Sequence, residues 1–145
     1  MKKDIDFPTV EGVFMAVARE PQSKQPGDYE WYVYLINQND FALENILVSS
    51  KGYGETTIAQ EDGSMARQAQ KTSVLRHRLA SLGPKSVAKI ERISPEVLGL
   101  CNEFWLSYYH REQLFDKKFV FVPESIIEQN CRPIAALQLE GILHG

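Results

Sequence analysis

Apolar and polar residues alternate along much of this chain, and the clearest example lies between Trp31 and Val48. In a β-strand successive side chains point to opposite faces, so such alternation predicts a strand with two different sides. One side of the first run carries Trp31, Val33 and Leu35, and the other carries Tyr32, Tyr34 and Ile36. A polar, turn-forming break at residues 37–40 follows, and the apolar alternation then resumes with Leu43, Ile46 and Val48. The stretch therefore predicts two strands joined by a short connection.

The same pattern predicts strands elsewhere in the chain. They are expected over 10–19, 55–60, 72–80, 86–93, 104–110 and 114–122, with the last two forming a hairpin. The KGYG sequence at 51–54 is expected to be a turn, and 64–70, rich in helix formers, a connection or one helical turn. Ser94 and Pro95 favour the start of a helix, which Gly99 limits to a turn or two.

Short strands at this spacing, separated by Gly, Pro and Asn turns, predict an all-β fold. We expect one antiparallel β-sandwich of seven or eight strands, with at most one or two short helical turns, and a barrel as the alternative. The length of 145 residues fits a single domain covering 1–145. Residues 1–9 are expected to be an extended arm, and residues 123–145 a C-terminal tail or an edge strand.

Three stretches resemble immunoglobulin-like sandwiches of the adhesion-module and adaptin-appendage type. They are WYVYLINQNDFALENILV, LASLGPKSVAKIERI and the NEFWLSYY that follows. In those domains an aromatic-bearing strand ends in Asn, a short corner follows, and a later L-G-P-x-S turn leads into a new strand. The resemblance spans roughly residues 10–122 and implies that the two strands of 31–48 lie in different sheets. Cys101 has no partner on an earlier strand, so the Cys, Trp, Cys spacing of antibody domains is absent.

Charge is distributed unevenly, although the net charge is only -3. Residues 67–92 contain 7 Lys and Arg against 1 Glu, while the remainder of the chain is acidic. Anion-binding candidates in this segment are Arg76, Arg78, Lys85, Lys89 and Arg92, which a hairpin of 72–80 and 86–93 would gather on one surface. The same charges are also explained if these residues form a solvent-exposed face that keeps strand edges from pairing with other chains. We favour this explanation over anion binding because residues 67–92 contain no aromatic residue on which a base could stack.

Aromatic residues offer a second candidate surface. Tyr32 and Tyr34 on one strand and Trp105 and Tyr109 on a later one are candidates for binding a protein partner, because aromatics are enriched at protein interfaces. The alternative is that they cover a second layer of core.

Catalytic and metal-binding patterns are not found in the sequence. Its three histidines, His77, His110 and His144, have no metal-ligand spacing with Cys101 or Cys131, and His77 alternates with two leucines as a partly buried residue would. No nucleophile elbow, P-loop or dinucleotide-binding glycine pattern occurs. A chain this short also has no room for the ATP-binding catalytic domain of a phenylalanyl-tRNA synthetase alpha subunit. We therefore expect no enzyme activity and no cofactor.

The sequence also predicts where the chain is located and what it binds. No stretch of the chain approaches the ~20 consecutive apolar residues that a membrane-spanning helix needs. Near the N-terminus, Asp4, Asp6 and Glu11 interrupt the apolar run that a signal peptide would require. With only two cysteines, we expect a cytoplasmic chain without membrane contact. The sequence predicts a non-catalytic module that binds a protein partner or self-associates, with nucleic-acid or anionic-ligand binding through 67–92 as the alternative.

Overall fold

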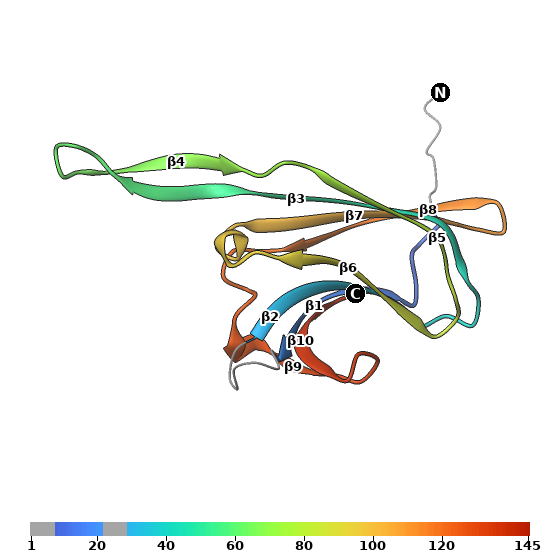
Figure 1. The fold of residues 1–145 in the computed structure, drawn as a ribbon. Coiled ribbons are helices and arrows are strands. Elements are labelled where there is room, and N and C mark those ends of the chain that lie inside the picture. The colour runs from blue at the N-terminus through green and yellow to red at the C-terminus, as the bar shows by residue number, and fades with distance from the viewer. Residues whose placement is uncertain (1–7, 22–28) are drawn as a thin grey trace, which may run out of the picture.

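The computed structural model describes residues 8–21 and 29–145, which form two antiparallel β-sheets stacked as a sandwich (Figure 1). Sheet A has the strand order β6-β2-β1-β10-β9. Its strands are β1 (Val13–Pro21), β2 (Tyr29–Asn37), β6 (Ser86–Ile93), β9 (Arg132–Ile134) and β10 (Leu139–His144). Sheet B has the order β4-β3-β7-β8, and β5 also pairs with β3. Its strands are β3 (Leu43–Ala59), β4 (Met65–Lys71), β5 (Leu75–Leu82), β7 (Cys101–His110) and β8 (Gln113–Phe121).

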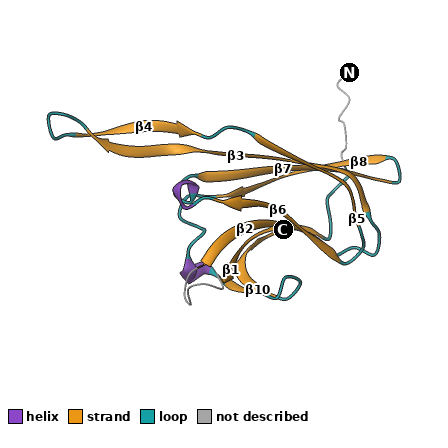
Figure 2. Ribbon diagram, in the orientation of Figure 1, coloured by secondary structure: helices purple, strands orange, loops and turns teal. Residues whose placement is uncertain are grey.

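The predicted all-β class and antiparallel sandwich are confirmed. Helical structure among the described residues is limited to two 3-10 turns, η1 (Pro95–Val97) and η2 (Glu128–Asn130), coloured purple in Figure 2. The described residues contain ten strands instead of the seven or eight expected, because β4 was not predicted as a strand and the C-terminal segment forms two strands instead of a tail or one edge strand. The helix start expected at Ser94 and Pro95 coincides with η1.

The core lies between the sheets and is built from the inward side of each alternating strand. Its buried members include Met15, Val17, Val33 and Leu35 from sheet A and Ile46, Val48, Phe104, Leu106, Tyr108 and Phe119 from sheet B. Strand β1 is covered on both faces, as its apolar sequence indicates: Ala16 packs with Ile36 and Ile134 in a second, smaller cluster. This cluster lies on the side of sheet A opposite the main core, where Phe14 and Leu137 also pack against it.

The connection between β2 and β3 crosses from one sheet to the other, which confirms the interpretation of residues 31–48 as a corner. Asn37 holds this corner and is fully buried. Its Nδ2 donates to the carbonyl oxygens of Phe41 and Gly83, each at 2.9 Å, and its Oδ1 accepts from the Asn39 N–H at 3.0 Å. One side chain thus ties the β2–β3 corner to the β5–β6 turn.

The prediction that residues 72–80 and 86–93 form a hairpin is wrong. Strand β5 pairs with β3 in sheet B, whereas β6 pairs with β2 in sheet A, so the intervening turn also crosses between sheets. Lys85 in this turn has a positive φ of 51°, which reverses the chain tightly. The basic residues of 67–92 are consequently divided between two sheets.

Strand β3 is twice as long as expected, and the turn predicted at 51–54 is wrong. Both glycines of KGYG lie within the strand, where they allow close packing instead of chain reversal. A Cβ at Gly52 would lie 3.1 Å from Thr72 Cγ2, and one at Gly54 would lie 3.2 Å from Leu100 Cδ2. The helix formers of 64–70 form strand β4, because pairing with β3 overrides their weak helix propensity.

The C-terminal segment expected to be a tail or an edge strand forms the β9–β10 hairpin, in which β10 pairs with both β1 and β9. At the other end, most of the expected extended arm over 1–9 lies outside the described residues.

Candidate binding faces

The outer face of sheet B carries the most exposed aromatic side chains of the predicted set. On β7, Phe104, Leu106 and Tyr108 are buried in the core, so Trp105 and Tyr109 point outward. Trp105 is 46% exposed and Tyr109 is 40% exposed. Large aromatic side chains that face solvent on a flat sheet offer apolar area without any change in backbone structure.

Two arginines of the basic segment lie on the same face. Ser49 of β3 pairs with Arg76 on one side and with Trp105 on the other, so the three residues form one row across the sheet. Because neighbouring strands are about 4.8 Å apart, the Cα atoms of Arg76 and Trp105 are separated by about 10 Å. Leu47 pairs in the same way with Arg78, so the two arginines occupy adjacent outward positions on β5. We call Arg76, Arg78, Trp105 and Tyr109 the sheet B face.

A hollow lies beside Tyr109 and Arg78. It has a volume of about 630 Å³ and is also lined by Asn45, Leu47 and Ser107. The hollow coincides with an irregularity in the pairing of β3 with β7 between Glu44 and Leu47, where Asn45 has a positive φ of 48°. A bulge of this kind bends a strand and re-aims its side chains. The bulge therefore gives an otherwise flat face a concave region.

Charges around Trp105 hold the indole in place. Its Nε1 donates to the Asp116 carboxylate, and Lys118 Nζ lies 4.8 Å from the centre of its ring. Glu103 in turn lies 3.8 Å from Lys118 Nζ and 3.5 Å from Lys51 Nζ. Arg76 and Arg78, by contrast, have no ion-pair partner within the part of the chain that the structure describes. The two guanidinium groups remain available to an acidic ligand.

The other predicted aromatic residues lie on the outer face of sheet A, where they already have partners. Tyr34 is only 6% exposed and its hydroxyl donates to Glu20. The Tyr32 hydroxyl donates to Glu30 at 2.7 Å. Lys89 Nζ lies 2.8 Å from Glu20 Oε1 and 4.1 Å from the centre of the Tyr32 ring. These side chains form a polar network on the outer face of sheet A.

The ionisation of this network is set by the same contacts. Burial alone would raise the pKa of Glu20, but hydrogen bonds from Lys89 and Tyr34 outweigh burial and lower it. Burial and the bond to Glu20 raise the pKa of Tyr34 well above its usual range. Of the remaining basic candidates, Arg92 lies 3.5 Å from Glu30, and Lys85 contacts Asp40 and the Gln38 carbonyl in the turn. The five basic candidates therefore do not form one patch.

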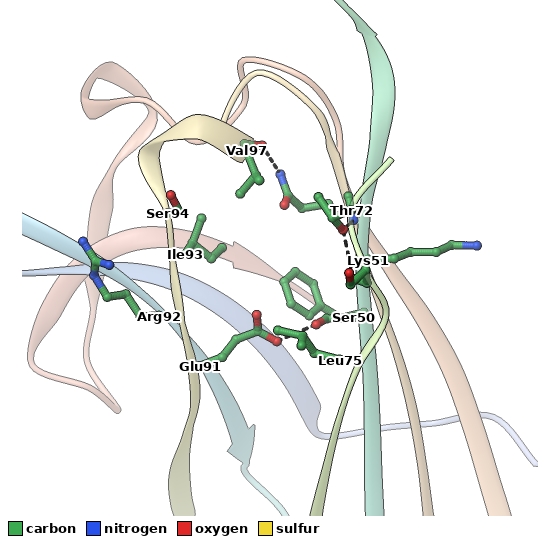
Figure 3. A pocket seen from close by; sticks show the side chains of 13 residues that line it. Ser50, Lys51, Thr72, Leu75, Glu91, Arg92, Ile93, Ser94 and Val97 are labelled. Carbon is green, nitrogen blue, oxygen red and sulfur yellow. Dashed lines mark hydrogen bonds between the residues drawn. The ribbon is translucent and has the colours of Figure 1, made fainter. Parts of the chain in front are cut away.

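A cavity of about 230 Å³ opens between the sheets, near the root of the β3–β4 ribbon. Figure 3 shows Glu91 reaching from β6 toward Ser50 on β3, whereas Arg92 points away from the cavity. Ser50 Oγ donates to Glu91 Oε1 at 2.6 Å, and His77 Nε2 lies 3.0 Å from the same oxygen. The sequence offered no signal for this cluster, because its three members come from three strands.

The geometry of this cluster differs from that of an activated serine. A nucleophilic hydroxyl must lie within hydrogen-bond reach of its base, and a third group then orients that base. In this cavity one carboxylate oxygen lies between the hydroxyl and the imidazole, which have no hydrogen bond to each other among the described residues. The contacts bridge β3 and β5 of sheet B to β6 of sheet A. Their evident effect is to fasten the two sheets together.

The described residues include no group of three or more His, Cys, Asp or Glu side chains arranged to hold a metal ion. None of the helical turns in the described ranges has the length and apolar character needed to cross a membrane.

Comparison with known proteins adds no family assignment: no protein-family model matches the chain, and no curated protein matches it either.

Proposed function

We propose that this chain is a non-catalytic binding module that docks a partner protein on the sheet B face. The observation that carries the proposal is the position of Trp105 and Tyr109 beside two arginines that have no ion-pair partner in the described residues. Trp, Tyr and Arg are the residue types that dominate binding energy at protein interfaces. Trp105 is already fixed by Asp116 and Lys118, so little side-chain entropy is lost when a partner covers it.

The chemistry of the face indicates what kind of segment it accepts. The hollow beside Tyr109 suits an apolar side chain, and Arg78 on its wall suits a carboxylate next to that side chain. An apolar residue flanked by Asp or Glu therefore fits best. The carboxylates of Glu103 and Asp116 at the opposite side of Trp105 disfavour a uniformly anionic ligand.

Quantitative affinity capture from native cells tests the proposal. A Trp105→Ser, Tyr109→Ser variant should lose at least one partner that the unchanged chain captures reproducibly. The matched control is Val87→Ser, Leu143→Ser, which removes two comparably exposed apolar side chains from sheet A and should retain that partner. Equal capture by both variants, or no reproducible partner at all, would contradict the proposal.

Binding of single-stranded nucleic acid is the second candidate, and one observation favours it. The basic segment contains no aromatic residue, but the pairing of β3 brings Trp105 next to Arg76. Aromatic rings and guanidinium planes together are the surfaces on which unpaired bases stack. Fluorescence anisotropy with labelled RNA and single-stranded DNA would then show affinity that falls steeply with salt. Arg76→Glu, Arg78→Glu should abolish this binding and Lys85→Glu should not; a flat response at low salt removes this candidate.

Two broader inferences accompany the proposal. The antiparallel sandwich is compatible with an immunoglobulin-like fold, and the sequence resemblance supports placing it with adhesion modules and adaptin appendages. Both cysteines are free in the structure, which supports the expectation of a reducing cytoplasmic location.

A further inference from the structure

The ribbon formed by β3 and β4 extends beyond the sandwich, at the left of Figure 1. Strand β7 ends its pairing with β3 at Tyr53, opposite Cys101, whereas β3 continues to Ala59 and pairs there with β4 alone. Both sides of this ribbon are largely exposed, including the apolar side chains of Ile58 and Met65. An isolated two-stranded ribbon is marginally stable in water, so a third strand would stabilise it.

Backbone hydrogen bonds show which groups of β3 remain open. Gly52 N–H donates to Thr72 Oγ1 at 2.7 Å and its carbonyl accepts from Thr72 N–H at 2.8 Å. At the far end, Gln60 N–H donates to the Ser64 carbonyl at 2.8 Å. Backbone groups alternate in direction along a strand, so even-numbered residues face β4. The N–H and C=O groups of Glu55, Thr57 and Ala59 consequently face the open edge.

This open edge has few of the features that usually prevent strand pairing. Residues 54–60 contain no Lys, Arg or Pro, and Glu55 is their one charged residue. The strands at the other sheet edges all carry basic residues or proline: these are Lys117 and Lys118 on β8, Lys89 and Arg92 on β6, Arg67 and Lys71 on β4, Arg76 and Arg78 on β5, and Arg132 and Pro133 on β9. The unprotected edge is therefore confined to the part of β3 that lacks a neighbour.

We propose that the open edge of β3 pairs with the same edge of a second copy of this chain, forming a symmetric antiparallel dimer. With the two-fold axis at Thr57, each Glu55 lies opposite Ala59 of the other copy and Thr57 lies opposite its own equivalent. No like charges face each other, and about six backbone hydrogen bonds form. The pairing uses the whole open edge and joins two ribbons into one four-stranded sheet.

Charge supports the same partner. In this register the ribbon tip of one copy, with Glu61 and Asp62, reaches the root of the other copy's ribbon. The root carries Lys71, opposite Tyr53, and Lys71 has no ion-pair partner among the described residues. Lys71 lies on the β4 side of Tyr53, about two strand spacings (~10 Å) from the other copy's tip, so each end of the dimer brings opposite charges within reach of long side chains. This dimer is independent of the sheet B face, which lies on the sandwich body.

Analytical ultracentrifugation over a range of concentrations tests the dimer directly. The full chain should dimerise, and Thr57→Lys, which places two ammonium groups opposite each other at the axis, should weaken dimerisation about tenfold or more. Gln68→Lys adds the same charge to the exposed strand β4 and should leave dimerisation close to that of the unchanged chain. A monomer up to about 100 µM, above the micromolar affinities of weak complexes, overturns the proposal.

Oxidative cross-linking gives a readout that does not depend on the charge variants. Antiparallel residues that exchange hydrogen bonds have Cα atoms about 5.5 Å apart, within the range of a disulfide. Thr57→Cys should therefore form a covalent dimer rapidly, whereas Gln68→Cys and the unchanged chain should not. Equal cross-linking by the two cysteine variants, or a dimer that Thr57→Lys leaves unchanged, would show that another surface mediates association.

Discussion

Replacing Asn37 by alanine should be one of the most destabilising single changes in this chain. The substitution removes the two 2.9 Å bonds to the Phe41 and Gly83 carbonyls and the 3.0 Å bond from the Asn39 N–H. A net hydrogen bond contributes about 1 kcal/mol, and a buried partner that water cannot reach costs about 1–3 kcal/mol more. Because Asn37 is fully buried, we expect the free energy of unfolding to fall by about 3–5 kcal/mol.

Urea unfolding followed by tryptophan fluorescence measures this loss, with Gln38→Ala as the control. Gln38 is the exposed neighbour of Asn37, and its truncation should change the free energy of unfolding by less than about 0.5 kcal/mol. For a chain of this size the Asn37 loss corresponds to a melting temperature lower by roughly 10–16 °C. A loss below about 1 kcal/mol for Asn37→Ala would show that the corner is held by core packing and not by this side chain.

Two further predictions test the packing and charge of sheet A. Gly141→Ala should lower the free energy of unfolding by about 1–3 kcal/mol, because the new Cβ would overlap the Val17 carbonyl and lie 2.6 Å from Ala18 Cα. Thermal unfolding measures this loss. Gly99→Ala, whose new Cβ would have no atom within 4 Å, should leave the melting temperature almost unchanged. Since the pKa of Glu20 is lowered in the folded chain, its stabilising effect is complete above its ordinary value of 4.5 and is lost as pH falls through the lowered pKa. The melting temperatures of the unchanged chain and Glu20→Gln should therefore differ near pH 6 and converge toward pH 2; a constant difference across this range would refute the assignment.

Alternation in the sequence was sufficient to predict several strands and the residues that share one side of each. Val33 and Leu35 share a side that faces the core in sheet A, and Ile46 and Val48 share one that faces it in sheet B. The extension of β3 was missed because glycine permits both turns and close packing, and only the positions of Thr72 and Leu100 distinguish the two uses. Strand β4 was missed because its pairing with β3 contributes more than the local preferences of Ala and Gln.

The candidate face was harder to predict than the fold. Alternation alone indicates that Arg76 and Arg78 share one side of a strand and that Trp105 and Tyr109 share one side of another. Their proximity arises because β5 and β7 both pair with β3, and such long-range pairing leaves no local trace in the sequence. The same topology separates Lys89 and Arg92 from the two arginines, although all four belong to one basic segment.

Site-specific photo-cross-linking in native cells tests most directly whether the sheet B face binds a partner. A photoreactive phenylalanine derivative at Tyr109 should give a discrete adduct that disappears when Arg76 and Arg78 are both changed to Glu. The same derivative at Leu143, which is exposed to a similar degree, should give none. Equal adducts from both positions, or an adduct at Tyr109 that persists without the arginines, would contradict the proposed role of this face.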